Sequence, residues 1–207
     1  MPVGVSAAVE GTTDEAVVLR LLAAVGAEPG TVYGKGGKAT LKMKMLGYAN
    51  AARHAPWVVV VDLDHDADCP PTLRAEWVPQ PAQYLCFCIA VREIEAWLLA
   101  DRNNIAAFLG VARSKVPSSP EQLADPKQAM VNLARQSRRA AIRMDMVPRE
   151  GSGRSIGPAY PSRVAEFARA HWDPMVAAVA SESLRRAIDR MTTLVKALEG
   201  QPEQSGG

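Results

Sequence analysis

The sequence lacks any long hydrophobic run. No apolar stretch among its 207 residues approaches the roughly 18 residues expected of a membrane span, and the N-terminus lacks the charged and apolar regions of a signal peptide. We therefore expect a cytoplasmic protein that makes no contact with a membrane.

Cysteine, aromatic residues and excess charge are also scarce. Three cysteines are too few, and odd in number, for a disulfide framework, so we expect free thiols in a reducing compartment. Aromatic residues make up 5% of the chain, which argues against a single-strand-binding surface of stacking rings. The net charge of +2 does not by itself indicate nucleic acid, so any basic surface must be local.

What the first half of the chain does contain is an alternation of apolar strands and helices. Strands are predicted at residues 3–9, 31–33, 57–61 and 83–91, and helices at 12–26 and 40–53. The run at 57–61 is too continuously apolar for a strand with one wet face. The pattern predicts an α/β fold: a mostly parallel sheet flanked by helices, with ligands bound beyond the carboxyl ends of its strands.

After residue 103 the strand signals stop. Helices are predicted at residues 125–144, 162–171 and 181–198, and the last residues are polar and rich in glycine. We expect an α/β core over residues 1–103, a helical extension over 104–198 packed on that core, and a disordered tail over 199–207.

Carboxylates follow two of the predicted strands. Glu10 ends the first strand and Asp62 the third, with Asp64 two residues on, so the three should meet at one edge of the sheet. Burying unpaired carboxylates together is costly, and a hard divalent cation is the usual remedy. Oxygen-only ligands indicate Mg²⁺ or Mn²⁺ rather than zinc.

Further acids could join this set. Asp14 lies four residues beyond Glu10, and Glu93 and Glu95 follow the fourth strand, so four segments deliver carboxylates to one edge. Asp14 equally suits any helix N-terminus, which favours negative charge. Asp66 and Asp68 fit better as solvated loop residues than as ligands.

Two segments carry a family resemblance. AAVEGTTDEAVVLRLL and VVVVDLDHD together resemble the TOPRIM domain of topoisomerases, primases and overcoming-lysogenization-defect nucleases. REIEAWLLAD, DPKQAM, GPAY and SESLRRAIDR resemble segments of an uncharacterised bacterial TOPRIM-like family that is often encoded near ATPase genes. By this resemblance, Glu10 would match the TOPRIM glutamate, and Asp62 and Asp64 its Asp-x-Asp pair.

The same resemblance places acids of the nuclease subgroup on Asp14 and on Glu93 or Glu95, although glutamate is commoner than aspartate at the first of these positions. It implies a TOPRIM-like fold and Mg²⁺- or Mn²⁺-dependent phosphoryl transfer, most simply nucleic-acid hydrolysis, in which Glu10, Asp62 and Asp64 would be catalytic. It also implies an ATPase partner and a role in defence against phage. The alternative is a non-catalytic, metal-binding regulatory or scaffold subunit of an ATPase complex.

Other metal-site motifs fit less well. An EF-hand loop starting at Asp62 would need glycine where Ala67 stands and an acid where Leu73 stands. A haloacid-dehalogenase-like phosphatase also begins with Asp-x-Asp after a strand, usually nearer the N-terminus, and stays a distant alternative. Cys86 and Cys88 lack the spacing of a structural zinc site.

Basic residues that could hold DNA or RNA fall into two groups. Lys35 and Lys38 belong to the glycine-rich segment GKGGK, which suits either an anion-binding nest or a flexible turn. Within the predicted helix at 125–144, Arg135, Arg138 and Arg139 would share one face, with Arg143 slightly around it. Such a stripe could follow a phosphate backbone, or simply be a solvated surface.

Overall fold

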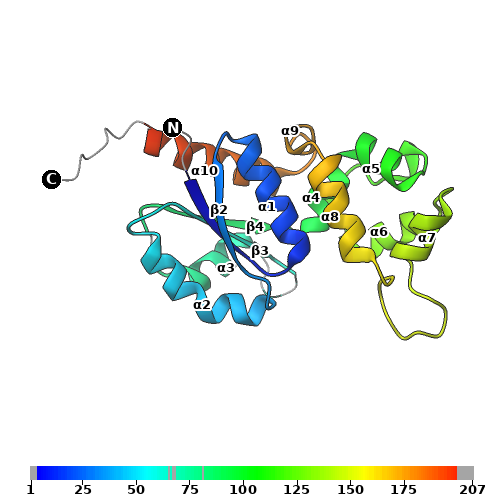
Figure 1. Ribbon diagram of the computed structural model, residues 1–207, viewed down its shortest axis with the longest axis horizontal. Coiled ribbons are helices and arrows are strands. Elements are labelled where there is room, and N and C mark those ends of the chain that lie inside the picture. The colour runs from blue at the N-terminus through cyan, green and yellow to red at the C-terminus, as the bar shows by residue number, and fades with distance from the viewer. Residues whose placement is uncertain (1–3, 65, 67–68, 81, 200–207) are drawn as a thin grey trace.

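Four strands pair into one sheet in the computed structural model, which describes residues 4–64, 66, 69–80 and 82–199 (Figure 1). The strands are β1 (Gly4–Val9), β2 (Glu28–Gly34), β3 (Trp57–Asp62) and β4 (Leu85–Ala90). Their order is β2-β1-β3-β4, and every pairing is parallel. The predicted α/β fold with a parallel sheet is confirmed.

The run of valines in β3 is explained by burial on both faces of the sheet. Val58 and Val60 belong to one buried cluster, whereas Val59 and Val61 belong to another on the opposite face. Successive strand residues point to opposite faces, so a strand covered on both sides must be apolar throughout.

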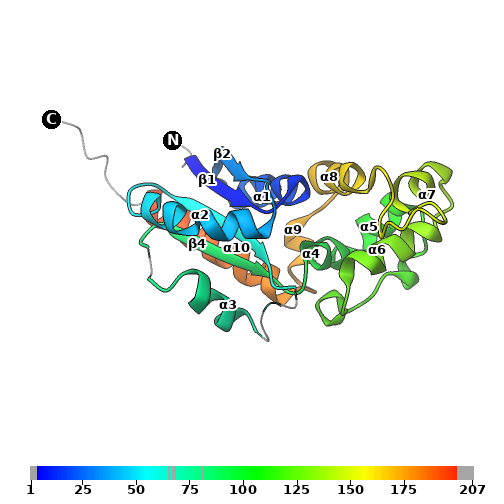
Figure 2. The ribbon, with the colours of Figure 1, turned by 90° about the horizontal axis from the view of Figure 1, so that it is seen from below.

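Helices cover both faces of the sheet. On one face lie α1 (Thr12–Ala24) and α10 (Glu182–Glu199), and on the other lie α2 (Lys38–Ala51) and α3 (Pro70–Trp77) (Figures 1 and 2). α10 comes from the C-terminal end of the chain, yet it packs against β4.

The remaining helices gather beyond the carboxyl end of β4, on the right in Figure 1. They are α4 (Ile94–Ala100), α5 (Arg102–Leu109), α6 (Pro126–Arg135), α7 (Ala140–Met146), α8 (Tyr160–Ala170) and α9 (Pro174–Ala177), with short 3-10 turns η1 (Arg113–Lys115) and η2 (Pro120–Gln122). Within the ranges described, no helix has the length and apolar character needed to cross a bilayer.

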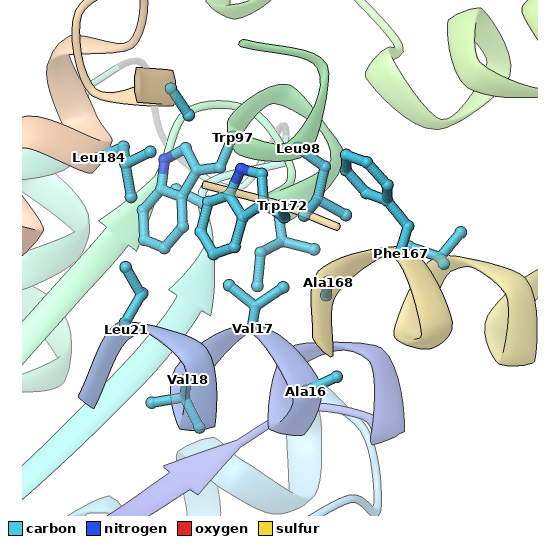
Figure 3. Close-up of a cluster of buried hydrophobic side chains, with 14 of the residues drawn as sticks. Ala16, Val17, Val18, Leu21, Trp97, Leu98, Phe167, Ala168, Trp172 and Leu184 are labelled. Atoms are coloured by element: carbon cyan, nitrogen blue, oxygen red, sulfur yellow. The ribbon is translucent and has the colours of Figure 1, made fainter. Parts of the chain in front are cut away.

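A continuous buried cluster joins the sheet to these helices. Figure 3 shows Trp97 and Trp172 side by side above Val17 and Leu21 of α1, with Phe167 of α8 beside them. Trp97 Nε1 also donates a hydrogen bond of 2.7 Å to Ser183 Oγ at the start of α10. The helical region therefore packs on the sheet layer through shared core residues, and the division near residue 103 stays a prediction.

The single helix predicted over residues 125–144 is wrong, because α6 ends at Arg135 and α7 begins at Ala140. The Ser137 hydroxyl donates to Leu109 O and accepts from Arg139 N, and Arg138 N donates to Gly110 O. Serine side chains offer the backbone such alternatives to a helical ladder. The segment turns here to bond with the end of α5.

Two further differences concern short segments and the tail. α3 and α5 form where the sequence analysis predicted no separate helix. Of the predicted disordered tail, Glu199 ends α10, and residues 200–207 lie outside the described part.

Candidate functional site

Six carboxylates surround the carboxyl ends of the strands, and we call them the acidic rim. They come from the ends of β1 and β3, the first turn of α1 and the start of α4. The members of the acidic rim are Glu10, Asp14, Asp62, Asp64, Glu93 and Glu95.

Direct hydrogen bonds tie three segments of the rim together. Glu10 Oε1 accepts a bond of 2.9 Å from Asp62 N, so the ends of β1 and β3 are joined. Asp62 Oδ1 in turn accepts a bond of 2.9 Å from Ile94 N at the start of α4. Residues 10 and 62, far apart in sequence, therefore meet as the parallel sheet predicts.

Asp64 is held in an unusual backbone conformation. Its φ is 49°, in the left-handed region that aspartate tolerates better than most residues. Asp64 N donates to Arg92 O at 2.8 Å, and Arg92 Nη1 donates to Asp64 O at 2.9 Å. This reciprocal pair fastens the loop after β3 to the loop after β4. Strained residues cluster at functional sites, which is consistent with a role for Asp64.

Glu95 is the most buried carboxylate of the rim, at 3% exposure. Its Oε1 accepts a bond of 3.2 Å from the Tyr160 hydroxyl, while its buried Oε2 has no partner among the described residues. An unsatisfied buried polar atom of this kind is rare and suggests an absent ion or water.

The other two rim acids, Asp14 and Glu93, form hydrogen bonds that stabilise the fold. Asp14 Oδ2 accepts a bond of 2.6 Å from Gly11 N and so caps the start of α1, as the helix-terminus alternative expected. Glu93 accepts bonds from both Lys127 N at 2.9 Å and Lys127 Nζ at 3.0 Å, which joins α4 to the start of α6. Lys127 Nζ also lies 3.9 Å from Glu95 Oε1.

Burial raises the pKa of several of these carboxyls. It raises the pKa of Glu10 to about 7, helped by the charges of Asp14 and Asp64 and opposed by the bond from Asp62 N. It raises the pKa of Glu95 to about 7, opposed chiefly by Lys127. Burial also lifts the pKa of Asp62 well above its usual range, and the charges of Asp14, Glu95 and Glu10 add to the effect. The pKa of Asp14 is raised for the same first reason.

These shifts describe one electrostatic group. The rim carboxylates are near enough to disfavour ionisation of one another, and additional positive charge among them would lower their pKa values. Perturbed carboxyls grouped at the ligand-binding edge of a sheet indicate a candidate functional site.

Lys38 already supplies part of that positive charge. Its ammonium lies 2.6 Å from Asp62 O, 2.8 Å from Asp64 Oδ2 and 2.7 Å from Asp66 Oδ2. Burial alone would lower the pKa of Lys38, but its hydrogen bonds to Asp64 and Asp66 raise it overall. Asp66 is exposed yet bound to Lys38, whereas Asp68 and His65 lie outside the described residues.

The glycine-rich loop between β2 and α2 places Lys38 beside the rim. Gly34 has a φ of 95°, and a Cβ there would lie 2.1 Å from Val9 O, so only glycine fits. Gly37 N then donates to Glu10 O at 3.0 Å. Lys35 on the same loop pairs with Glu15 at 3.0 Å. Both lysines of GKGGK thus contact carboxylates, and their predicted role in binding nucleic acid stays a prediction.

The rim has oxygen ligands suited to a divalent cation but no complete ligand set within the described part of the chain. Across the described ranges, no three acidic, histidine or cysteine side chains form a ready ligand set. The donor chemistry nevertheless fits Mg²⁺ or Mn²⁺, because every candidate ligand is an oxygen and the orphaned Glu95 Oε2 needs a cationic or donor partner. Lys38 and Lys127 meet part of the same need from within the chain.

The four predicted nucleic-acid-binding arginines do not form one helical stripe. Arg135 ends α6, Arg138 and Arg139 lie in the turn, and Arg143 belongs to α7, so the prediction of a shared helix face is wrong. All four are exposed, and none forms an ion pair within the described residues. Arg139 Nη1 donates a hydrogen bond of 3.1 Å to Phe108 O, and Arg143 Nη1 donates one of 2.5 Å to Ser137 O.

Arg92 has no clear signal in the sequence, whereas Lys127, in DPKQA, fits either a residue near the metal centre or an ordinary helix start. Arg92 holds Asp64 through the backbone, and Lys127 binds Glu93 from 34 residues away. The sequence indicates only that an edge rich in acids needs basic partners, not which basic residues supply the charge.

Comparison with family models, with curated proteins and with solved structures finds no match to this chain.

Proposed function

We propose that the acidic rim is the active site of a metal-dependent phosphoryl-transfer enzyme, and that its reaction is hydrolysis of DNA or RNA. The observation that carries this proposal is the convergence of Glu10, Asp62 and Glu95 from three segments, with the pKa of each raised by burial. Such an arrangement is costly for stability alone and favours cation and phosphate chemistry. The resemblance to TOPRIM nucleases supports the same function.

Asp62, Asp64 and Glu10 would hold the cation, and the free oxygen of Glu95 is the next candidate ligand. When bound, Mg²⁺ or Mn²⁺ would supply charge neutralisation at a phosphate and a lowered pKa for water. Asp14 and Glu93 would contribute chiefly through the electric field, because their oxygens cap α1 and hold Lys127.

Side chains of the site could transfer protons and neutralise the charge of a bound phosphate. If Glu10 is not a ligand, it could serve as the general base, because its pKa in the metal-free protein is about 7. Lys38 and Lys127 form ion pairs with carboxylates of the rim. When a phosphate binds, their ammonium groups could leave these carboxylates and pair with the phosphate oxygens. The exposed arginines of α6, α7 and the turn between them, beyond the strand ends in Figure 1, would attract the polyanion.

Cleavage assays test this proposal. Supercoiled plasmid, single-stranded DNA and structured RNA would be incubated with the protein in Mg²⁺, Mn²⁺ or EDTA, beside the double variant Asp62→Ala/Asp64→Ala. We expect metal-dependent cleavage of at least one polymer that the double variant lacks. Cleavage that persists in EDTA or in the double variant would contradict the proposal.

A matched pair of variants separates chemistry from folding. Asp62→Asn keeps the size of the side chain and an oxygen to accept from Ile94 N, and should abolish cleavage while the protein stays folded. Asp189→Asn on α10 changes an exposed acid outside the rim and should cleave normally.

The second candidate function is a non-catalytic subunit. Lys38 and Lys127 pair with rim acids as fixed internal cations, which would suit a site that no longer needs metal. In that case the protein would show no cleavage with any of the three polymers, even where Mg²⁺ raises its melting temperature. An ATPase partner, implied by the family resemblance, would then be the binding target to test.

A further inference from the structure

A pocket of about 460 Å³ opens along the edge of β4. α3 forms one wall, α10 the opposite wall and β4 the floor, and none of the rim carboxylates lines it. Its polar lining includes three arginines, Arg74, Arg186 and Arg190.

Two of these guanidinium groups converge on one backbone oxygen. Arg74 Nη1 and Arg190 Nη1 each donate to Phe87 O at 3.2 Å, one from α3 and the other from α10. Their nitrogens can therefore be no farther apart than twice that distance. Two positive charges are thus held close together at the pocket floor.

Neither of these two arginines forms an ion pair within the part of the chain that the structure describes. The two acids that line the pocket are engaged elsewhere. Glu121 accepts hydrogen bonds from Ser181, Glu182 and Ser183 at the start of α10. Glu182 pairs with Arg185 and Arg186 on its own helix.

Satisfying the carbonyl of Phe87 at the edge of β4 does not explain why two arginines bind it. An arginine carries five N–H donors, and each of these uses one on Phe87 O. One guanidinium would satisfy that carbonyl, whereas a second adds repulsion between like charges. Paired guanidinium groups instead match the oxygens of a phosphate, which they can bind in a bidentate manner.

Beside the arginines and the polar residues Glu121, Gln122, Glu182 and Ser183, the lining has an apolar part. Pro70 and Pro71 on α3, Ile89 and Val91 at the end of β4, and Ala187 on α10 surround the arginines. The volume falls in the range of small-molecule sites, roughly 300–1,000 Å³. A ligand with a phosphate for the arginines and a flat, weakly polar body for the prolines would use both parts.

We propose that this pocket binds an organic phosphate of mononucleotide size, with its phosphate between Arg74 and Arg190 and its ring against Pro70 and Pro71. No rim carboxylate lines this pocket, and the proposal does not depend on the proposed nuclease function.

Calorimetric titrations with AMP, UMP, adenosine and inorganic phosphate test the site. EDTA is present throughout, so that no cation bridges phosphate to the acidic rim. We expect AMP or UMP to bind, inorganic phosphate to bind more weakly, and adenosine not to bind. Wild-type protein that binds neither nucleotide below about 10 mM, a Kd near the weak end of specific binding, would overturn the proposal. Adenosine binding as tightly as AMP would also overturn it.

Variants assign the binding to the two arginines. Arg74→Gln and Arg190→Gln should each weaken AMP binding by about tenfold or more, the scale of a lost charge-assisted bidentate contact. Arg185→Gln, on the same helix but paired with Glu182 and Asp189, should bind as wild type does. Equal affinity in all three variants would contradict the assignment. If Arg74→Gln fails to fold, the exposed Arg190 alone decides the outcome.

Discussion

At the scale of single residues, the main finding is that a lysine lies where a metal site was predicted. Lys38, the first residue of α2, contacts Asp62 O, Asp64 and Asp66 just after a loop held by glycines. The sequence could not place Lys38, because GKGGK is consistent with an anion nest but fits a flexible turn better. The carboxylates had a clearer signal, since strand ends bring acids together wherever the sheet is parallel.

Replacing Lys38 should make the protein depend on divalent cations for stability. In EDTA, Lys38→Met should lower the free energy of unfolding by about 1–2 kcal/mol, a modest loss because Asp64 and Asp66 are 38% and 52% exposed and water screens them. Added Mg²⁺ should restore more stability to this variant than to wild type. Thermal melts in EDTA and in millimolar Mg²⁺ measure both effects.

Lys35→Met is the matched control, because Lys35 lies on the same loop and pairs with Glu15 at the surface. It should change stability little and respond to Mg²⁺ as wild type does. The account of Lys38 would be contradicted by two lysine variants that behave alike.

Glu95 should make stability fall as pH rises. Its pKa of about 7 in the folded protein exceeds the ordinary value of 4.5, so the folded state holds more protons than the unfolded state between these values. The contribution of Glu95 to the free energy of unfolding then decreases from about pH 4.5 to about pH 7, by on the order of 3 kcal/mol at most. Without metal, Glu95→Gln should therefore be more stable than wild type at pH 8 and similar to it below pH 4.5.

Urea unfolding in EDTA at pH 4.5 and pH 8 checks this difference. Glu150→Gln, on an exposed loop, should show no such change between the two pH values. A Glu95→Gln variant that is less stable than wild type at pH 8 would show that the buried charge is stabilising.

At the scale of elements, helix ends determine how distant segments join. Glu121 is the main contact at the start of α10, since its Oε1 accepts bonds of 2.6, 2.9 and 2.6 Å from Ser181 Oγ, Ser183 N and Ser183 Oγ. Ser183 Oγ also accepts from Trp97 Nε1, so this cap is bonded to one of the two core tryptophans that Figure 3 shows. No pattern in the sequence connects residue 121 to this helix.

Glu121→Ala should cost about 2–3 kcal/mol of stability, because several donors at the start of α10 lose a charged acceptor at once. Chemical denaturation measures the loss. Gln122→Ala, the exposed neighbour, should cost less than about 0.5 kcal/mol. Equal losses of stability in the two variants would contradict this prediction, because water would then satisfy the donors at the start of α10 as well as Glu121 does.

Element boundaries were predictable where packing is periodic and not where side chains compete with the backbone. β3 and β4 occupy nearly the predicted residues, because runs such as Val58 to Val61 suit only a doubly covered strand. The break between α6 and α7 depends on Ser137 bonding to Leu109, a tertiary contact that helical periodicity does not encode.

At the scale of the whole molecule, the parallel topology explains why the site forms at all. β1 and β3 are adjacent in the order β2-β1-β3-β4, so Glu10 and Asp62 meet across 52 residues of sequence. The fold class and the edge that carries the acids followed from strand and helix alternation. The lysines that neutralise the rim and the arginines along the edge of β4 depend on loop paths and helix packing, which the sequence does not reveal.

A titration with Mn²⁺ tests our proposal that the acidic rim binds a divalent cation. Free Mn²⁺ would be followed by electron paramagnetic resonance in wild type and in Asp62→Asn, which keeps an oxygen for Ile94 N but removes the charge. The account predicts saturable binding to wild type that is weaker by at least about tenfold in the variant. No binding to wild type, or equal binding to both proteins, would contradict it.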